Sequence, residues 1–131
     1  MRIEAYFARL RDLIETCPVV QLSNVTYEKR GTHAGFVRGE LSFVDGSILH
    51  LREYVDVENV VDCLMYVYQY AEANQALIFR YDNTGHHRRM NLASYPHHKH
   101  KHEGSEMNII PSSAPDLAEV LEEIQRLIVL P

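Results

Sequence analysis

The sequence is short of cysteine and of long apolar runs. Of its 131 residues only Cys17 and Cys63 are cysteine, and they stand far apart without a CxxC motif. This spacing excludes a disulfide framework and a cysteine-built zinc site, and it favours a reducing cytoplasm. No stretch approaches the roughly 18 apolar residues of a membrane span, and the N-terminal segment mixes charge into its apolar positions, unlike a signal peptide. We therefore expect a cytoplasmic protein without a membrane partner.

The common nucleotide-binding and hydrolase motifs are also absent. The chain contains no GxxxxGK[ST], no GxGxxG, no HExxH and no GxSxG. Glycine-rich phosphate loops, zinc-protease helices and serine nucleophiles therefore have no basis in this sequence. The formal net charge of −5 argues against a protein that coats nucleic acid indiscriminately, because such binding needs an excess of exposed Lys and Arg.

The composition and the ends of the chain predict one α+β domain over residues 1–131. The sequence is 46% hydrophobic and 24% charged, as in globular proteins, and it is long enough to bury one core. Apolar residues recur at three- and four-residue steps over residues 1–16, before Pro18, and again over residues 117–128. Each pattern predicts an amphipathic helix. Ser113 and Asp116 predict a capping box at the start of the second helix.

Between these helices the apolar pattern changes to a period of two. The segments with this pattern begin near Val19, Ala34, Ser47, Asp62 and Ala76. They predict an antiparallel meander, so we expect a sheet of five or six strands with the N- and C-terminal helices packed on one face. Tyr66, Tyr68 and Tyr70 share one side of the fourth strand, and we expect them to pack against a helix. The alternative for these tyrosines is a platform on which bases stack.

A hairpin is predicted at Asp45-Gly46, and its register places a carboxylate in the core. A three-residue loop over residues 45–47 matches the apolar faces of the two strands and sets Glu53 opposite Gly39 on the apolar side. Glu53 then has two interpretations. It is either a structural carboxylate paired with Arg80 of a neighbouring strand, or a buried acid whose pKa is tuned for chemistry.

Residues 80–102 are the most unusual part of the chain. Arg80 and Asp82 lie on the same side of a predicted strand, which ends at Asn83. Residues 80–102, with both ends included, contain five Lys or Arg residues and six histidines, and the only acidic residue in this range is Asp82. An arginine oriented by a carboxylate can bind phosphate through two N–H groups. The alternative is an ordinary surface ion pair of little energetic weight.

The segment PHHKHKH, residues 96–102, alternates histidine with lysine. If extended, it places His98, His100 and His102 on one face, and the other face holds His97, Lys99 and Lys101. Histidines with pKa values near neutrality suit general acid and base catalysis on a phosphodiester. Together with Arg80 and Lys99, which would neutralise the developing charge, they could cleave RNA through its own 2′-hydroxyl without a metal.

Two other interpretations of this segment stay open. Neutral imidazoles could bind zinc or another divalent metal, with Asp82, Glu53 or His86 completing the ligand shell. The interleaved lysines oppose a bound cation, so we rank this second. The third interpretation is a solvated basic loop without a site.

Several segments resemble the TumE family of small toxins from prokaryotic toxin-antitoxin systems. The segments are GFVRGELSFVDGSILHLREY, FRYDN with the following HH, and PHHKH, closed by a short acidic helix. The resemblance spans nearly the whole chain. It implies a cognate antitoxin, often a helix-turn-helix protein, and a ribonuclease-like activity. The matching positions are Arg38, Glu53, Arg80, Asp82, Asn83, His86, Pro96, His97, His98, Lys99 and His100. The chain departs from the family pattern at Arg88-Arg89-Met90 and at Lys101-His102, which add to the basic patch.

We therefore expect the toxin component of a type II system, a candidate metal-independent endoribonuclease that needs no cofactor. His98 and His100 would act as acid and base, Arg80 would bind phosphate, and Asp82 or Glu53 would orient them. The residues expected to contact RNA are Arg38, Asn83, His86, Arg88, Arg89, His97, Lys99 and Lys101. Three alternatives remain: a metal-dependent nuclease, a nucleotide-modifying toxin, and a non-catalytic module that binds nucleic acid or protein. A homodimer also stays open.

Overall fold

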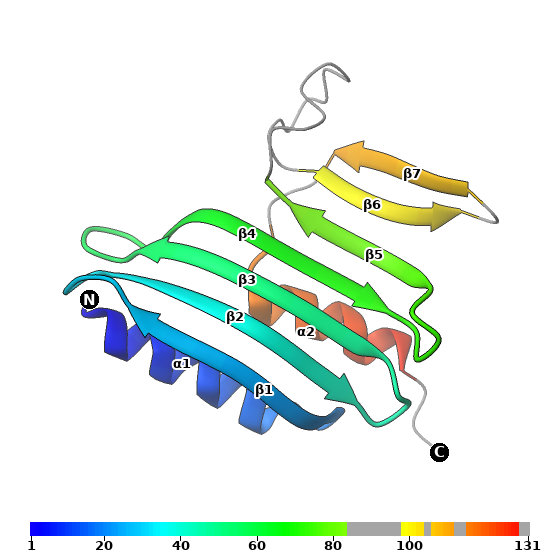
Figure 1. Ribbon diagram of the computed structural model, residues 1–131, viewed down its shortest axis with the longest axis horizontal. Helices are drawn as coiled ribbons and strands as arrows, with labels where there is room; N and C mark the ends of the chain where they lie inside the picture. Colours follow the sequence, from blue (N-terminus) through cyan, green and yellow to red (C-terminus); the bar gives the residue numbers. More distant parts are fainter. Residues whose placement is uncertain (84–97, 104–105, 112–114, 129–131) are drawn as a thin grey trace.

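The computed structural model describes residues 1–83, 98–103, 106–111 and 115–128, with side chains for 1–83, 99–100 and 115–128. The elements are α1 (Ile3–Thr16), β1 (Val20–Lys29), β2 (Ala34–Phe43), β3 (Ile48–Asp56), β4 (Asp62–Ala71), β5 (Leu77–Asp82), β6 (His98–Glu103), β7 (Glu106–Pro111) and α2 (Leu117–Leu127). The strands form one sheet in chain order, with every neighbouring pair antiparallel (Figure 1). The predicted α+β meander with terminal helices is confirmed. Over the described residues the sheet has seven strands rather than five or six, because the histidine–lysine segment pairs with the residues that follow it.

The terminal helices form where the apolar periodicity predicts them. α1 buries one apolar stripe, formed by Ile3, Tyr6, Phe7, Leu10 and Ile14, and ends at Thr16, two residues before Pro18. The capping box of α2 is three residues later than predicted. The Asp116 carboxylate accepts from the Glu119 backbone N–H at 2.9 Å, and the Glu119 carboxylate accepts from the Asp116 N–H at 3.3 Å. In the described part of the chain, no helix has the length and apolar character needed to cross a membrane.

The sheet has a helix face, covered by α1 and α2, and an open face. The helix face carries the buried alternate residues of the central strands, which are Leu49, Leu51, Glu53, Val55, Tyr66, Tyr68 and Tyr70. The three tyrosines thus pack against the helices, as predicted, and do not form an exposed platform. The open face contains a depression of about 530 Å³ whose lining includes Arg38, His50, Arg52, Gln69 and Arg80. Figure 1 is viewed from the open face, and α2 passes behind the strands.

The β2–β3 hairpin keeps the predicted faces but has a different register. Its three-residue loop is 44–46, one residue earlier than predicted, because Gly46 has φ +88°. That left-handed conformation ends a three-residue hairpin loop and favours glycine. The pairing therefore shifts by two residues, and Glu53 lies opposite Val37 rather than Gly39. An even shift leaves every side chain on its predicted face.

Two rows of paired residues cross the open face at right angles to the strands. The first row is Glu40, His50, Gln69, Arg80 and His100. The second row is Arg38, Arg52, Val67 and Asp82, and the backbone of His98 on β6 extends it. Because adjacent strands are about 4.8 Å apart, neighbours in a row are close enough to interact. Each row therefore brings together residues from five strands, β2 to β6.

The loop conformation at Gly46 predicts a specific loss of stability. Gly46→Ala should lower the free energy of unfolding by about 1–2 kcal/mol, because a left-handed conformation is unfavourable for alanine. The new Cβ would also lie 3.3 Å from the Cβ of Ala73. Urea denaturation measures the change. Gly31→Ala is the matched control, because no atom lies within 4 Å of its added Cβ. Equal stabilities of the two variants would contradict this account of the register.

Candidate functional site

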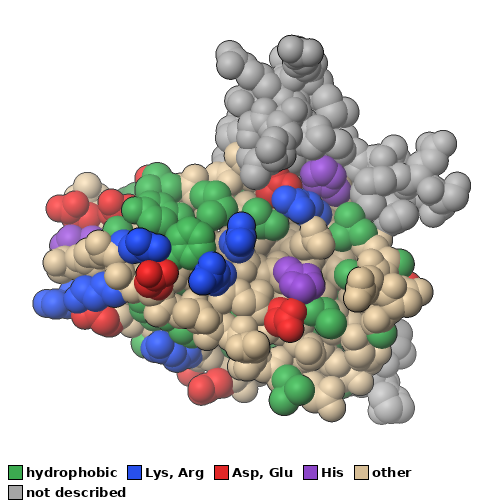
Figure 2. Space-filling view, in the orientation of Figure 1, with side chains coloured by type: hydrophobic (Ala, Val, Ile, Leu, Met, Phe, Trp, Pro, Cys, Tyr) green, Lys and Arg blue, Asp and Glu red, His purple; other side chains and the backbone are tan. Residues whose placement is uncertain are grey.

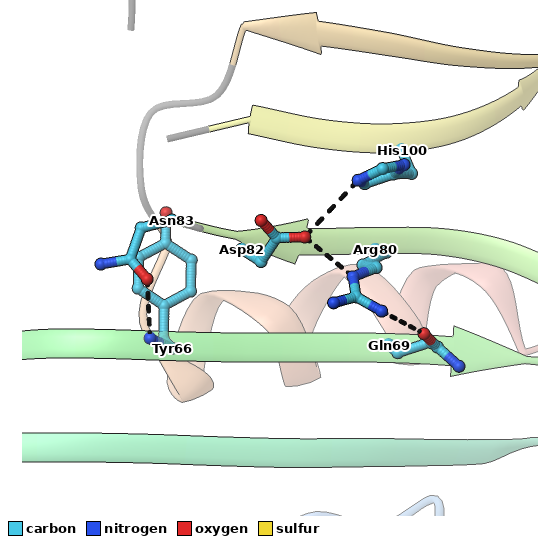
Figure 3. Close-up of polar contacts among 6 residues, drawn as sticks. All are labelled: Tyr66, Gln69, Arg80, Asp82, Asn83 and His100. Atoms are coloured by element: carbon cyan, nitrogen blue, oxygen red, sulfur yellow. Dashed lines mark hydrogen bonds and ion pairs between the residues drawn. The ribbon is translucent and has the colours of Figure 1, made fainter. Parts of the chain in front are cut away.

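Arg80, Asp82 and His100 meet on the open face where β5 pairs with β6. The Arg80 Nε–H donates to Asp82 Oδ2 at 2.8 Å, and its Nη1–H donates to Gln69 Oε1 at 2.9 Å. The His100 Nε2 lies 3.5 Å from the same Asp82 oxygen (Figure 3). Strand alternation places Arg80 and Asp82 on one side of β5, and the register sets His100 opposite Arg80. One carboxylate oxygen therefore faces both the guanidinium and the imidazole.

The three side chains differ in their contact with solvent. The side chain of Asp82 is 1% exposed, whereas that of His100 is 17% and that of Arg80 is 31% exposed. A buried carboxylate needs paired cations or hydrogen-bond donors to offset its lost hydration. Asp82 therefore holds Arg80 and His100 in position, while the partly exposed side chains of these two residues can reach a ligand on the open face.

Arg80 is held in a way that suits phosphate binding. Its Nε and Nη1 donate within the protein, to Asp82 and Gln69. Among the described residues, no partner accepts from its Nη2. A guanidinium with two fixed nitrogens and an available third is oriented before an anion arrives, which reduces the entropic cost of binding.

His50 and Glu40 belong to the same row, although the sequence pattern did not indicate either residue. The His50 Nδ1 lies 3.4 Å from Glu40 Oε2, and both side chains are about half exposed, at 53% and 46%. Gln69 lies between His50 and Arg80 in the row. The predicted hairpin register, which was wrong by two residues, did not pair His50 with Glu40. Gly46 was the signal that could have corrected it.

Glu53 is not part of this site. It is completely buried on the helix face, where it accepts hydrogen bonds from the hydroxyl of Tyr6 and, at 2.8 Å, from that of Tyr68. The predicted pair of Glu53 with Arg80 is wrong, because β4 lies between their strands and their side chains point to opposite faces. Burial raises the pKa of the Glu53 carboxyl, and the hydrogen bonds from the two tyrosines partly oppose that rise.

Lys99 is also on the helix face, away from Arg80. Its Nζ lies 2.9 Å from Glu123 Oε2 of α2 and 4.6 Å from the ring centroid of Tyr81. The Tyr81 hydroxyl donates to the other oxygen of Glu123 at 2.6 Å. Lys99 therefore joins the sheet to α2, and the structure does not bring it to the phosphate-binding position that we expected.

The remaining predicted residues have different positions. Asn83 accepts from the Tyr66 backbone N–H at 3.0 Å and donates to the Leu64 carbonyl at 3.1 Å, so it joins the end of β5 to β4. Arg38 lines the depression on the open face. The backbones of His98 and Lys101 pair with Asp82 and Phe79. The other predicted contacts, His86, Arg88, Arg89 and His97, lie outside the described residues.

The structure gives no metal centre within its described part. There, no group of three or more His, Cys, Asp or Glu side chains is arranged to hold a metal ion. Asp82 and His100 approach each other, and the cationic Arg80 also contacts Asp82. A guanidinium at that position opposes a bound cation.

The sequence matches the family model described as Toxin TumE over residues 10–128. The chain belongs to the TumE toxin family. The matched range contains Arg80, Asp82 and His100 and all seven strands of the described sheet, so the predicted resemblance is confirmed. A TumE protein is the toxin component of a toxin-antitoxin system, which implies an antitoxin partner. No curated protein and no solved structure matches the chain.

The buried carboxyl of Glu53 predicts a pH dependence of stability in this TumE toxin. Its pKa is higher in the folded than in the unfolded chain, so the protonated group contributes stability that is present below about pH 4.5. This contribution is lost as the pH rises towards the folded pKa, by about 1.4 kcal/mol per pH unit. Glu53→Gln removes the titration. The free energy of unfolding of the variant, relative to the parent, should therefore increase with pH.

Urea denaturation from about pH 4 to pH 8 measures this difference. Glu58→Gln is the control, because Glu58 is an exposed residue of the β3–β4 connection. If the free energies of unfolding of the parent and of Glu53→Gln change with pH in parallel over the whole range, the pKa of the Glu53 carboxyl is not raised by burial.

Proposed function

We propose that this toxin is a metal-independent endoribonuclease whose active site contains Arg80, Asp82 and His100, with His98 as a further catalytic residue. The observation that supports the proposal is the buried Asp82 carboxylate, which lies 2.8 Å from Arg80 and 3.5 Å from His100. A guanidinium and an imidazole thus lie beside the same carboxylate on the open face, and we assign phosphate binding to the first and proton transfer to the second. Metal-independent cleavage of RNA needs both groups.

The proposed reaction uses the 2′-hydroxyl of the substrate as nucleophile. A general base takes the proton of that hydroxyl, and the 2′-oxygen attacks the adjacent phosphorus. The bond from phosphorus to the 5′-oxygen breaks, and a general acid gives that oxygen a proton. The products are a 2′,3′-cyclic phosphate and a 5′-hydroxyl. The guanidinium of Arg80 would stabilise the charge on the non-bridging oxygens, which is greatest in the transition state.

Asp82 favours one assignment of the two proton transfers. The Asp82 carboxylate lies 3.5 Å from His100 Nε2, and an anion beside an imidazole favours the protonated form that a general acid needs. We therefore assign the acid role to His100. The base role is assigned to His98, whose backbone pairs with Asp82 one row away. The family supports the toxin role, while the chemistry is our proposal.

Substitution of His100 should abolish most of the activity. His100→Ala removes one proton transfer from the reaction, and we expect the rate of RNA cleavage to fall by about 100-fold or more. Purified protein incubated with total RNA and resolved on a denaturing gel measures this rate. The parent should cleave equally well with and without EDTA.

His33→Ala is the matched control, because His33 lies in the β1–β2 connection and contacts the Met1 carbonyl at 2.7 Å rather than the depression. It should cleave RNA at the parental rate. A His100→Ala variant that cleaves as fast as the parent would overturn the assigned site. Loss of cleavage in EDTA would overturn the metal-independent mechanism.

A further inference from the structure

The open face carries a second cluster of aromatic and cationic side chains beside the proposed active site. Phe36 and Tyr54 face each other across β2 and β3, and Arg38 and Arg52 do so in the next row. We name these four residues the aromatic–arginine platform. Figure 2 shows this face, where hydrophobic side chains gather beside Lys and Arg side chains. The platform and Arg80 lie on the same face of one continuous sheet.

The two arginines of the platform are placed where they repel each other. Like charges directly opposite on neighbouring strands are destabilising. Both side chains are exposed, and neither forms an ion pair with an acid of the described residues. The acids nearest in the rows have other partners, since Glu40 contacts His50 and Asp82 contacts Arg80. Paired guanidiniums without a carboxylate form a binding site for an anion such as phosphate.

The aromatic residues identify the kind of anion. The rings of Phe36 and Tyr54 are 6.1 Å apart between centroids, and both are only partly buried. α1 and α2 cover the other face of the sheet, so they do not cover these rings. Exposed aromatic side chains on a sheet stack with unpaired bases, whose phosphates then lie on neighbouring cations. Phe36 and Arg38 are two residues apart on β2, so their Cα atoms are about 7 Å apart. This separation allows the ring to stack with a base while the guanidinium binds the phosphate of the same nucleotide.

We propose that the platform binds a single-stranded segment of the RNA substrate beside the scissile bond. Arg38 and Arg52 hold one phosphate, and Phe36 and Tyr54 stack with the attached bases. This inference rests on the proposed function and extends it. Arg52 lies on β3 and Arg80 on β5, and β4 separates these strands by about 10 Å. The platform and Arg80 therefore bind different phosphates of the RNA. The substrate therefore has at least two phosphodiesters, and base-paired RNA is excluded because its bases are not free to stack.

The test measures binding of an RNA that cannot be cleaved. An eight-nucleotide, 2′-O-methylated single strand with a fluorescent label is titrated with protein at several salt concentrations, and anisotropy gives the dissociation constant. Arg38→Gln/Arg52→Gln should weaken binding at least tenfold. It should also make the slope of log affinity against log salt shallower by about 0.7 for each phosphate that the variant no longer neutralises.

The aromatic pair and a charge-matched control separate stacking from general electrostatics. Phe36→Leu/Tyr54→Leu should weaken binding at least fivefold with an unchanged salt slope, because stacking carries no net charge. Arg9→Gln/Arg126→Gln removes the same charge from α1 and α2, on the covered side, and should bind as the parent does. All four platform side chains lie outside the core, so these variants keep the buried contacts.

Three results would overturn the inference. The first is that both platform variants bind the oligonucleotide as tightly as the parent. The second is that a duplex of the same sequence binds the platform as tightly as the single strand. The third is that the platform variants keep RNA affinity and lose only their complex with the antitoxin, which would make the platform a protein interface. Failure of the proposed function is distinguishable, because a parent that binds the strand through the platform but never cleaves unmodified RNA refutes only the nuclease.

Discussion

Asp82 keeps a carboxylate almost completely out of water at the junction of β5 and β6. Such a group is tolerated only when cations or donors surround it, and leaving it unpaired costs about 3–5 kcal/mol. The burial of Asp82 restricts the positions of Arg80 and His100, since each of these side chains must stay close to the same carboxylate oxygen. Gln69 then fixes the other side of the guanidinium. The geometry of the site therefore follows from the need to compensate one buried charge.

Strand alternation divides the remaining polar residues between the helix face and the open face. Neighbouring residues such as Lys99 and His100 point to opposite faces, so one contacts α2 and the other lies in the site. Glu53 and Arg52 are divided in the same way: Glu53 lies among the core tyrosines, whereas Arg52 is exposed. The helix face holds buried polar networks that are satisfied by the protein itself. The open face keeps cations that the described carboxylates do not neutralise, which suits a polyanionic substrate.

The sequence was sufficient to predict local features of the fold. Apolar residues that repeat every 3.6 residues predicted both helices, and those that repeat every two residues predicted the start of each strand from β1 to β5. Burial of one face of a helix or strand imposes these periods. The common side of Arg80 and Asp82 followed from the same alternation. The hairpin register was wrong by two residues, because any even shift matches apolar faces equally well and only the conformation of Gly46 distinguishes the shifts.

Interactions between remote segments could not be predicted in this way. Lys99 has its carboxylate partner on α2, and Glu53 has one of its hydroxyl partners on α1. Nothing in the local sequence of either residue specifies these partners, so both were assigned to the site. His50 was missed because its place in the row depends on the hairpin register. Residues that lie on one strand were thus easier to group than residues that meet across the sheet.

We propose that Asp82 acts through Arg80 and His100 as one unit. A double-mutant cycle of Asp82→Asn and His100→Ala, measured as kcat/KM for RNA cleavage, tests it most directly. The double variant should be no slower than the slower single variant, because each substitution disables the same unit. Losses that multiply, as for two independent residues, would contradict it.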